Sequence, residues 1–164
     1  MTIPDSRLLN IAGFLVCSAM MAYALYAEHQ LLLEPCPLCV FERMSVTALG
    51  IVFLVAALQN PQAWGRRVHA FLIVLAAGFG IGVASRHLWL QNLPADKVPS
   101  CGPGFDYIID SFPLSDALKL IFSGSGECAT VDWLFLGLSM PAYVLIGVAV
   151  MGGFGIWVNL RKVV

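Results

Sequence analysis

Four of the five cysteines stand where thiol–disulfide chemistry can take place. Cys36 and Cys39 enclose Pro-Leu in a Cys-x-x-Cys motif directly before a long apolar segment. Cys101 and Cys128 follow in a later, more polar stretch. A helix N-terminus stabilises a thiolate, so we expect Cys39, at the start of the apolar segment, to be activated more strongly than Cys36. Two cysteine pairs are implied, one local and one long-range, and the local pair has the character of a redox-active disulfide.

Zinc binding and purely structural disulfides are the alternative uses of these cysteines. Four thiolates suit a tetrahedral zinc site, but such sites usually pair two short-spaced motifs, and Cys101 and Cys128 are far apart. Glycine-rich flanks on both of these residues predict exposed sulfurs, which suits a disulfide that an incoming thiolate attacks. Cys17, inside an apolar segment, is expected to fill space in a helical bundle. Redox chemistry is the preferred interpretation.

Charged side chains interrupt the apolar segments at two places. Glu42 and Arg43 lie in the segment that follows the Cys-x-x-Cys motif, and Arg86 precedes His87 near the end of the next one. Charges inside a membrane are costly and indicate function. Arg43 follows Cys39 by four residues, which places both on one helix face, about 6 Å apart along the axis. For Arg43 we favour a functional role over snorkelling to lipid headgroups, whereas for Arg86 the two interpretations stay balanced.

A thiolate, a cation and an imidazole at the edge of a membrane suit a quinone as the reaction partner. A quinone is a lipid-soluble electron acceptor whose carbonyl oxygens gain negative charge and then protons on reduction. We expect Arg43 to stabilise the developing charge and His87 to supply a proton or a hydrogen bond. His29, near the end of the first apolar segment, is a weaker candidate, and His69 is expected to be incidental.

The composition indicates an integral membrane protein. The chain has 164 residues, of which 59% are hydrophobic and 12% charged, and its mean hydropathy is +0.84. About 25% of the residues of an ordinary globular domain are charged, so a soluble domain of this size could not cover its surface. Disorder is excluded because disordered chains are poor in apolar residues. The net charge of −1 argues against nucleic acid as a partner.

Four apolar segments are long enough to cross a bilayer as helices, which needs about 20 residues. They are residues 8–27, 40–58, 68–90 and 141–160. The first could be a signal peptide, but its apolar run is too long, and Arg7 before it is balanced by Asp5. The sequence therefore predicts an all-α integral membrane protein, with a four-transmembrane-helix bundle as a single membrane domain over residues 1–164.

The basic residues set the expected orientation of these segments. They gather beside the segment ends on one side, whereas the opposite side is mainly acidic; the basic residues are Arg7, Arg66, Arg67, Arg161 and Lys162. Positive residues are retained in the cytoplasm, so both termini are expected there. The connections 28–39 and 91–136 then face the other compartment. Because persistent disulfides belong to oxidising compartments such as the bacterial periplasm, the four outer cysteines fit this placement.

Glycines inside the segments predict where the helices approach one another. In lipid, helices associate through van der Waals packing, and small residues allow close approach. We expect close contacts at Gly78 and Gly82, which form a Gly-x-x-x-Gly motif, and at the cluster of Gly152, Gly153 and Gly155. Such contacts support a compact bundle.

The long connection 91–136 contains a short amphipathic pattern. Residues 113–122 place apolar side chains at helical spacing, with polar residues on the other side. A helix on the membrane surface fits this pattern better than one packed on the loop's own core, because little else in the loop is apolar. The apolar positions are Leu114, Ala117, Leu118 and Ile121.

Three blocks of the sequence resemble the DsbB family, the bacterial disulfide bond formation protein B. Glu34-Pro-Cys-Pro-Leu-Cys-Val-Phe-Glu-Arg43 is similar to the first periplasmic motif of that family. Residues 123–129 and 133–141 are similar to its second loop and the start of its fourth span, and residues 87–91 to the end of its third. Chain length, span number, orientation and cysteine order agree over the rest of the chain.

The resemblance implies a quinone-dependent thiol oxidase of the bacterial inner membrane. A reduced periplasmic DsbA-like protein would attack Cys101 of a Cys101–Cys128 disulfide, and Cys128 would then attack Cys36. Cys39 would be released as a thiolate beside the quinone, which is ubiquinone, or menaquinone without oxygen. The amphipathic segment would hold the loop at the membrane so that the two disulfides can meet.

The resemblance also bears on the charged residues. Arg43 and His87 stand at matching positions and are carried over as quinone-site residues. Arg86 matches no fixed basic residue of the family pattern, so it has no assigned role.

Two rival interpretations remain. A vitamin K epoxide reductase-like enzyme uses similar cysteines and quinones on a four-helix bundle, but Phe-Glu-Arg after the first motif favours the DsbB family. A haem or metal scaffold built on His29, His69 and His87 would need histidines in stacked pairs, and the sequence does not provide them.

Overall fold

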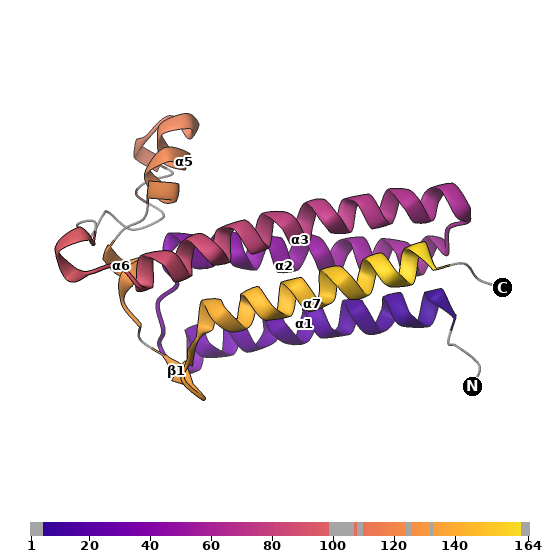
Figure 1. The fold of residues 1–164 in the computed structure, drawn as a ribbon, viewed down its shortest axis with the longest axis horizontal. Helices are drawn as coiled ribbons and strands as arrows, with labels where there is room; N and C mark the ends of the chain where they lie inside the picture. The colour runs from indigo at the N-terminus through magenta and orange to yellow at the C-terminus, as the bar shows by residue number, and fades with distance from the viewer. Residues whose placement is uncertain (1–4, 99–106, 108–109, 124–125, 132, 162–164) are drawn as a thin grey trace.

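Four long helices form an elongated bundle and run side by side along its length (Figure 1). The computed structural model describes residues 5–98, 107, 110–123, 126–131 and 133–161. The helices are α1 (Ser6–Gln30), α2 (Pro37–Gln59), α3 (Ala63–Gln91) and α7 (Met140–Leu160). Each contains one of the four predicted segments, and each is long and apolar enough to cross a membrane. The predicted fold class is confirmed.

The start and the end of α2 follow from its sequence. Pro37 takes the first helical position, where a backbone N–H is not needed. Cys36 is the N-cap, and its sulfur accepts the backbone N–H of Cys39. Asn60 ends the helix in the left-handed conformation, with Pro61 directly after it. The Cys-x-x-Cys motif therefore occupies the first turn of α2, at the rim of the bundle.

The core of the bundle is a column of apolar side chains between the helices. Leu49 and Phe53 of α2 and Ile73 of α3 are fully buried in the central cluster. A second buried cluster contains Cys36 and Leu38 at the end of the bundle. Large apolar side chains elsewhere on the four helices are exposed, among them Leu15, Ile51, Phe71 and Val150. Apolar outer faces on four helices of this length suit contact with lipid tails, as in a multi-pass membrane protein.

Three glycines allow close helix contacts, and two of them, Gly152 and Gly155, belong to the cluster that the sequence predicts. A Cβ at Gly13 of α1 would lie 2.7 Å from the Phe53 ring, and one at Gly155 of α7 would lie 2.8 Å from it. A Cβ at Gly152 would lie 2.7 Å from the Cβ of Ala77. Larger residues at these three positions would force the helices apart.

The Gly-x-x-x-Gly prediction is wrong in detail. A Cβ at Gly78, Gly82 or Gly153 would meet nothing within 4 Å. Gly80 makes the contact instead, because a Cβ there would lie 2.5 Å from the Ser45 hydroxyl. Positions two apart on a helix face different directions, so the face that carries Gly80 cannot also present Gly78 and Gly82.

The described residues of the connection between α3 and α7 include several short elements. Its helices and strands are η1 (Ala95–Lys97), α5 (Leu114–Ser123), α6 (Gly126–Ala129), β1 (Leu134–Phe135) and β2 (Leu138–Ser139). The two strands pair antiparallel as a hairpin beside the start of α7. Helix α6 packs against α3, and this contact brings the second loop to the rim of the bundle.

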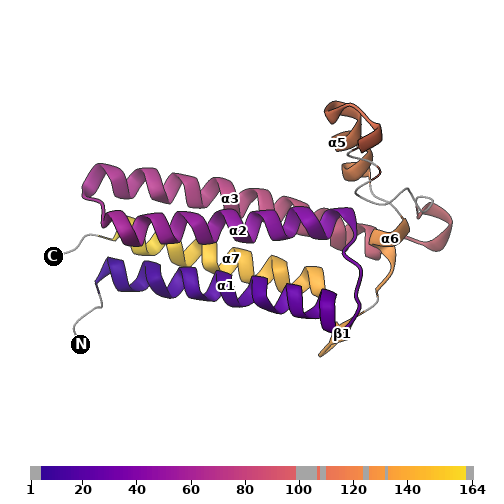
Figure 2. The same ribbon diagram turned by 180° about the vertical axis from the view of Figure 1, so that it is seen from behind.

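Helix α5 confirms the short helix that was predicted in this loop. It stands away from the bundle axis, near the ends of α2 and α3 (Figures 1 and 2). Ile121 is buried in the cluster of Leu38, so this position of the apolar face packs on the bundle. The side chains of Leu114, Ala117 and Leu118 lie outside the described part of the chain.

Arg86 links α3 to this helix. Its Nε donates to the carbonyl of Phe122 (3.3 Å), and its guanidinium carbon lies 4.2 Å from the centre of the Trp89 ring. These contacts of Arg86 are with α5 and with Trp89, outside the Cys-x-x-Cys motif.

Polar contacts join the helices at the opposite end of the bundle, where α1 and α3 begin and α7 ends. The guanidinium of Arg66 donates to the carbonyls of Val158 and Asn159 at 3.3 and 3.2 Å, and also to that of Arg161. The side chain of Asn159 donates to that of Asn10 (3.2 Å), and both are buried. Buried polar groups in a membrane need partners within the protein, and these contacts tie α7 to α3 and α1.

Candidate active site

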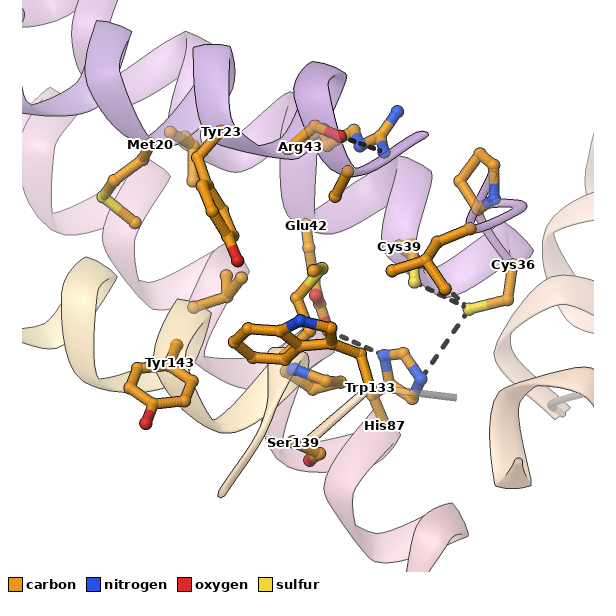
Figure 3. Close-up of a pocket in the computed structure, with 18 of the residues that line it drawn as sticks. Met20, Tyr23, Cys36, Cys39, Glu42, Arg43, His87, Trp133, Ser139 and Tyr143 are labelled. Atoms are coloured by element: carbon orange, nitrogen blue, oxygen red, sulfur yellow. Dashed lines mark hydrogen bonds and ion pairs between the residues drawn. The ribbon is translucent and has the colours of Figure 1, made fainter. Parts of the chain in front are cut away.

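A cavity of about 690 Å³ opens at the end of the bundle that carries the Cys-x-x-Cys motif. Its walls come from α1, α2, α3 and α7 and from the β1–β2 hairpin, and they are mainly apolar. The aromatic side chains of Tyr23, Trp133 and Tyr143 pack against one another along one side (Figure 3). The reactive and charged residues gather toward the other side; they are Cys36, Cys39, Glu42, Arg43 and His87.

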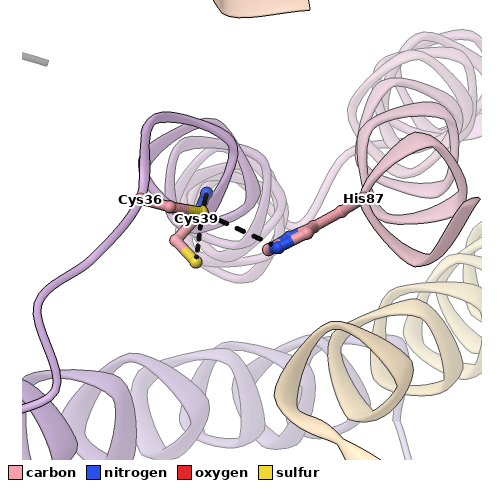
Figure 4. Close-up of side chains that lie close together, drawn as sticks. All are labelled: Cys36, Cys39 and His87. Atoms are coloured by element: carbon pink, nitrogen blue, oxygen red, sulfur yellow. Dashed lines mark hydrogen bonds between the residues drawn. The ribbon is translucent and has the colours of Figure 1, made fainter. Parts of the chain in front are cut away.

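The two sulfurs of the motif are neighbours. The Sγ atoms of Cys36 and Cys39 lie 3.0 Å apart, and the backbone N–H of Cys39 donates to the Cys36 sulfur (3.4 Å). Cys36 is buried and Cys39 is partly exposed, and both residues line the cavity. Their side chains lie together at the start of α2, with His87 pointing toward them from α3 (Figure 4). Hydrogen bonds to the sulfurs of Cys128 and Cys39, together with burial, raise the pKa of the Cys36 thiol. In the dithiol form, Cys36 therefore keeps its proton at neutral pH.

Cys128 lies beside Cys36 and is completely buried. This overturns the prediction that its glycine-rich flank leaves it exposed. Gly126, in the same short helix, is itself buried, so a glycine-rich flank does not by itself predict exposure. Cys101 lies outside the described residues.

Arg43 is held at the cavity by α1. Its guanidinium forms an ion pair with the carboxylate of Glu28 and donates to the carbonyl of Ala24 (3.2 Å). Its side chain is only 22% exposed. Arg43 and Cys39 both line the cavity, as their helical spacing predicts. A paired and largely buried guanidinium is not one that snorkels to headgroups.

His87 joins α3 to α2 through two side chains. Its Nδ1 lies 2.8 Å from Oε1 of Glu42, and its Nε2 lies 3.7 Å from the sulfur of Cys36. His87 and Glu42 are both buried. His29 and His69 instead bind carbonyls of their own helices, at 2.9 and 2.7 Å, and neither lines the cavity.

Comparison with known proteins decides the family. The profile of the family described as Disulfide bond formation protein DsbB matches residues 6–158. The chain belongs to the DsbB family. A relative named Disulfide bond formation protein B from Nitrosococcus oceani is 50% identical over 145 residues, which are 88% of this chain and 86% of that protein. One of the same name from Methylococcus capsulatus is 47% identical over 164 residues, 99% of this chain and all of the relative.

Membership of the DsbB family implies thiol oxidoreductase activity in disulfide bond formation. The geometry of the sulfurs fits this chemistry. Cys36, Cys39 and His87 have ligand atoms within 4.8 Å of one another, close enough for a metal ion. Two thiolates on one zinc ion, however, would lie about 3.8 Å apart. The 3.0 Å separation of Cys36 and Cys39 instead suits two sulfurs that form and break a bond with each other.

Two pairings in the site of this DsbB-family chain, Glu28 with Arg43 and Glu42 with His87, could not be predicted from the sequence. Glu28 is one of many acidic residues on the outer side, and nothing in its spacing marks it as the partner of Arg43. Glu42 does carry a signal, since it is a charge inside an apolar segment, but its partner His87 lies on another helix.

Proposed function

We propose that this protein is an inner-membrane thiol:quinone oxidoreductase. It reoxidises a periplasmic DsbA-like thiol oxidase and passes the electrons through two cysteine pairs to ubiquinone, or to menaquinone when oxygen is absent. DsbA–DsbB–quinone chains are the established route that keeps the bacterial periplasm oxidising. The observation that carries the proposal is a single cavity that brings together a partly exposed cysteine of the Cys-x-x-Cys motif, a guanidinium and an imidazole.

The cavity fits a quinone by size and by chemistry. Its volume of about 690 Å³ suits a small-molecule site, and its apolar walls suit a ring with an isoprenoid tail. A bound quinone supplies a two-electron, two-proton acceptor. Arg43 would bind and stabilise the carbonyl oxygen on which negative charge develops, while Trp133 and Tyr143 would pack on the ring and exclude water.

The contact between the two cysteine pairs supports a relay. A thiolate of the DsbA-like partner attacks Cys101 of the Cys101–Cys128 disulfide, and Cys128 leaves as a thiolate. Cys128 then attacks Cys36, which breaks the Cys36–Cys39 disulfide and releases Cys39 as a thiolate at the cavity. The packing of Cys128 beside Cys36 in one buried cluster suits this second exchange.

The charge distribution supports the proposed orientation. Helix α1 begins and α7 ends at one end of the bundle, opposite the cysteines (Figures 1 and 2). Arg7, Arg66 and Arg161 lie at that end. This end would face the cytoplasm, with the cavity at the periplasmic edge of the membrane.

The direct test uses the purified protein in lipid nanodiscs with a reduced DsbA protein and ubiquinone. We expect one disulfide to form for each quinone reduced, with catalytic turnover. Quinone reduction is followed by ultraviolet absorbance and thiol loss by alkylation. Equal thiol oxidation with and without quinone would contradict the proposal.

Arg43→Ala should raise the KM for ubiquinone about 10- to 100-fold and change kcat less. A change of this size corresponds to the loss of one hydrogen bond to a charged group. Steady-state kinetics at varied quinone concentration measure it. Arg67→Ala is the matched control, because Arg67 is exposed at the other end of the bundle. A KM for Arg43→Ala equal to that of the control would refute the role of Arg43.

A further inference from the structure

Glu42 is a buried carboxylate in a membrane-spanning helix, and neither electron transfer nor quinone binding as proposed above requires it. Its side chain is 4% exposed and that of His87 is 3% exposed. Burying an acidic group is costly unless hydrogen bonds and opposite charge compensate for it. Its described side-chain partner is His87, at 2.8 Å. The arrangement thus places a carboxylate behind an imidazole that faces a reactive sulfur.

The contact with Glu42 determines which nitrogen of His87 carries the proton. An ionised carboxylate only accepts hydrogen bonds, so Nδ1 must be the nitrogen that donates to it. In a neutral imidazole, Nε2 then has a free lone pair. That nitrogen lies 3.7 Å from the sulfur of Cys36, within the range of a hydrogen bond to sulfur, as the dashed lines in Figure 3 show.

We propose that Glu42 is a positioning residue that holds His87 as the base for the thiol of Cys36. This inference rests on the proposed thiol:quinone activity and deepens it. Cys36, His87 and Glu42 then form a chain of nucleophile, base and orienting carboxylate, the arrangement that activates hydroxyl and thiol groups in hydrolases. Here it serves disulfide formation.

The reaction balances as follows from the dithiol form. Cys36 and Cys39 together lose two protons and two electrons, and one bond forms between their sulfurs. The quinone accepts both electrons and both protons and leaves as quinol. His87 takes the proton of Cys36 on Nε2, and Glu42 stabilises the positive charge that the imidazole then carries. Because His87 also lines the cavity, it can pass a proton on to that side.

The surroundings of His87 support this role. Cys36, Cys39 and Glu42 face it from α2 and Cys128 from α6, while Arg86 precedes it on α3. The positive charge of Arg43 is paired with Glu28 and therefore does not oppose a second positive charge on His87. The raised pKa of the Cys36 thiol also means that this group needs a base at neutral pH.

The proton position can be measured without quinone. The chain has three histidines, so nitrogen NMR of protein labelled with 15N-histidine resolves each ring, and His29 and His69 serve as internal controls of the fold. At a pH where the ring is neutral, we expect His87 with the proton on Nδ1 in the wild type. In Glu42→Leu we expect the proton on Nε2. A wild-type His87 that carries its proton on Nε2 would overturn the proposal, even if the enzyme is fully active.

The kinetic test compares Glu42→Gln, Glu42→Asp and Asp116→Asn in single-turnover oxidation of the dithiol by ubiquinone. We expect Glu42→Gln to slow the step about 10- to 100-fold with an unchanged KM for quinone, and Glu42→Asp to recover part of the rate. Asp116 is an exposed acid on α5 and its variant should match the wild type. If Glu42 had only a structural role, its substitution would not slow dithiol oxidation while leaving the KM for quinone unchanged.

The pH dependence gives a second kinetic readout. When Nε2 carries the proton, as expected in Glu42→Leu, His87 cannot accept the proton of Cys36; the step then requires Cys36 that is already a thiolate, and the raised pKa keeps that fraction small. The rate of Glu42→Leu should therefore climb about tenfold per pH unit above neutrality, whereas the wild type should vary less. Parallel profiles would overturn the proposal. A wild type that fails to reduce quinone at all would instead overturn the proposed function and leave the NMR result to decide the place of the proton.

Discussion

Alanine in place of Cys39 is expected to abolish quinone-dependent oxidation of a DsbA dithiol. Cys39 is the more exposed residue of the pair, it lines the cavity, and in the proposed relay its electrons go to the quinone. Without this sulfur the Cys36–Cys39 disulfide cannot form, and the electron path to the quinone ends there. Alanine at Cys36, Cys101 or Cys128 should abolish turnover as well, because the proposed relay passes through each of these sulfurs.

The measurement is quinone reduction by nanodisc-embedded variants under multiple-turnover conditions. Cys17→Ala provides the matched control, since Cys17 is buried in the central cluster of the bundle and contacts no other cysteine there. It should retain activity while any loss of packing shows as a lower Tm. Wild-type turnover by any one of the four variants would break the relay.

Features that depend on one helix could be predicted from the sequence. The spacing of Cys39 and Arg43 needs only the period of an α-helix, and both side chains do line one cavity. The four helices follow from runs of apolar residues and are found within a few residues of the predicted limits. The start of α2 follows from Pro37, which fits only the first turn of a helix.

Features that depend on two helices could not be predicted in the same way. The pairs Glu28–Arg43 and Glu42–His87 form only if α1 and α3 are suitably rotated about their own axes relative to α2. The amino-acid composition of the helices does not determine this rotation. The glycine contacts show the same limit. Gly80 rather than Gly78 faces its neighbours, because the packing of Ser45 and Val148 selects one face of α3.

The burial of Cys128 links the chemistry to partner exchange. A fully buried sulfur cannot be the first point of attack by another protein, because disulfide exchange requires access to the sulfur. The attack would therefore fall on Cys101, and Cys128 would be the sulfur that carries the electrons inward to Cys36. This division of roles agrees with the position of Cys128 beside the buried end of α2.

A Cys128→Ser protein should consequently accumulate a mixed disulfide with oxidised DsbA. The thiolate of Cys101 attacks the disulfide of DsbA, one sulfur of DsbA leaves as a thiol, and no Cys128 remains to displace the bound partner. A DsbA variant that lacks its second active-site cysteine, activated with a small disulfide reagent, should make the adduct nearly stoichiometric. Mass spectrometry of the joined peptides identifies the linkage, and the double variant Cys101→Ser/Cys128→Ser should form no adduct. An adduct through Cys36 or Cys39, or one that survives the loss of Cys101, would show that the electrons enter this protein by another route.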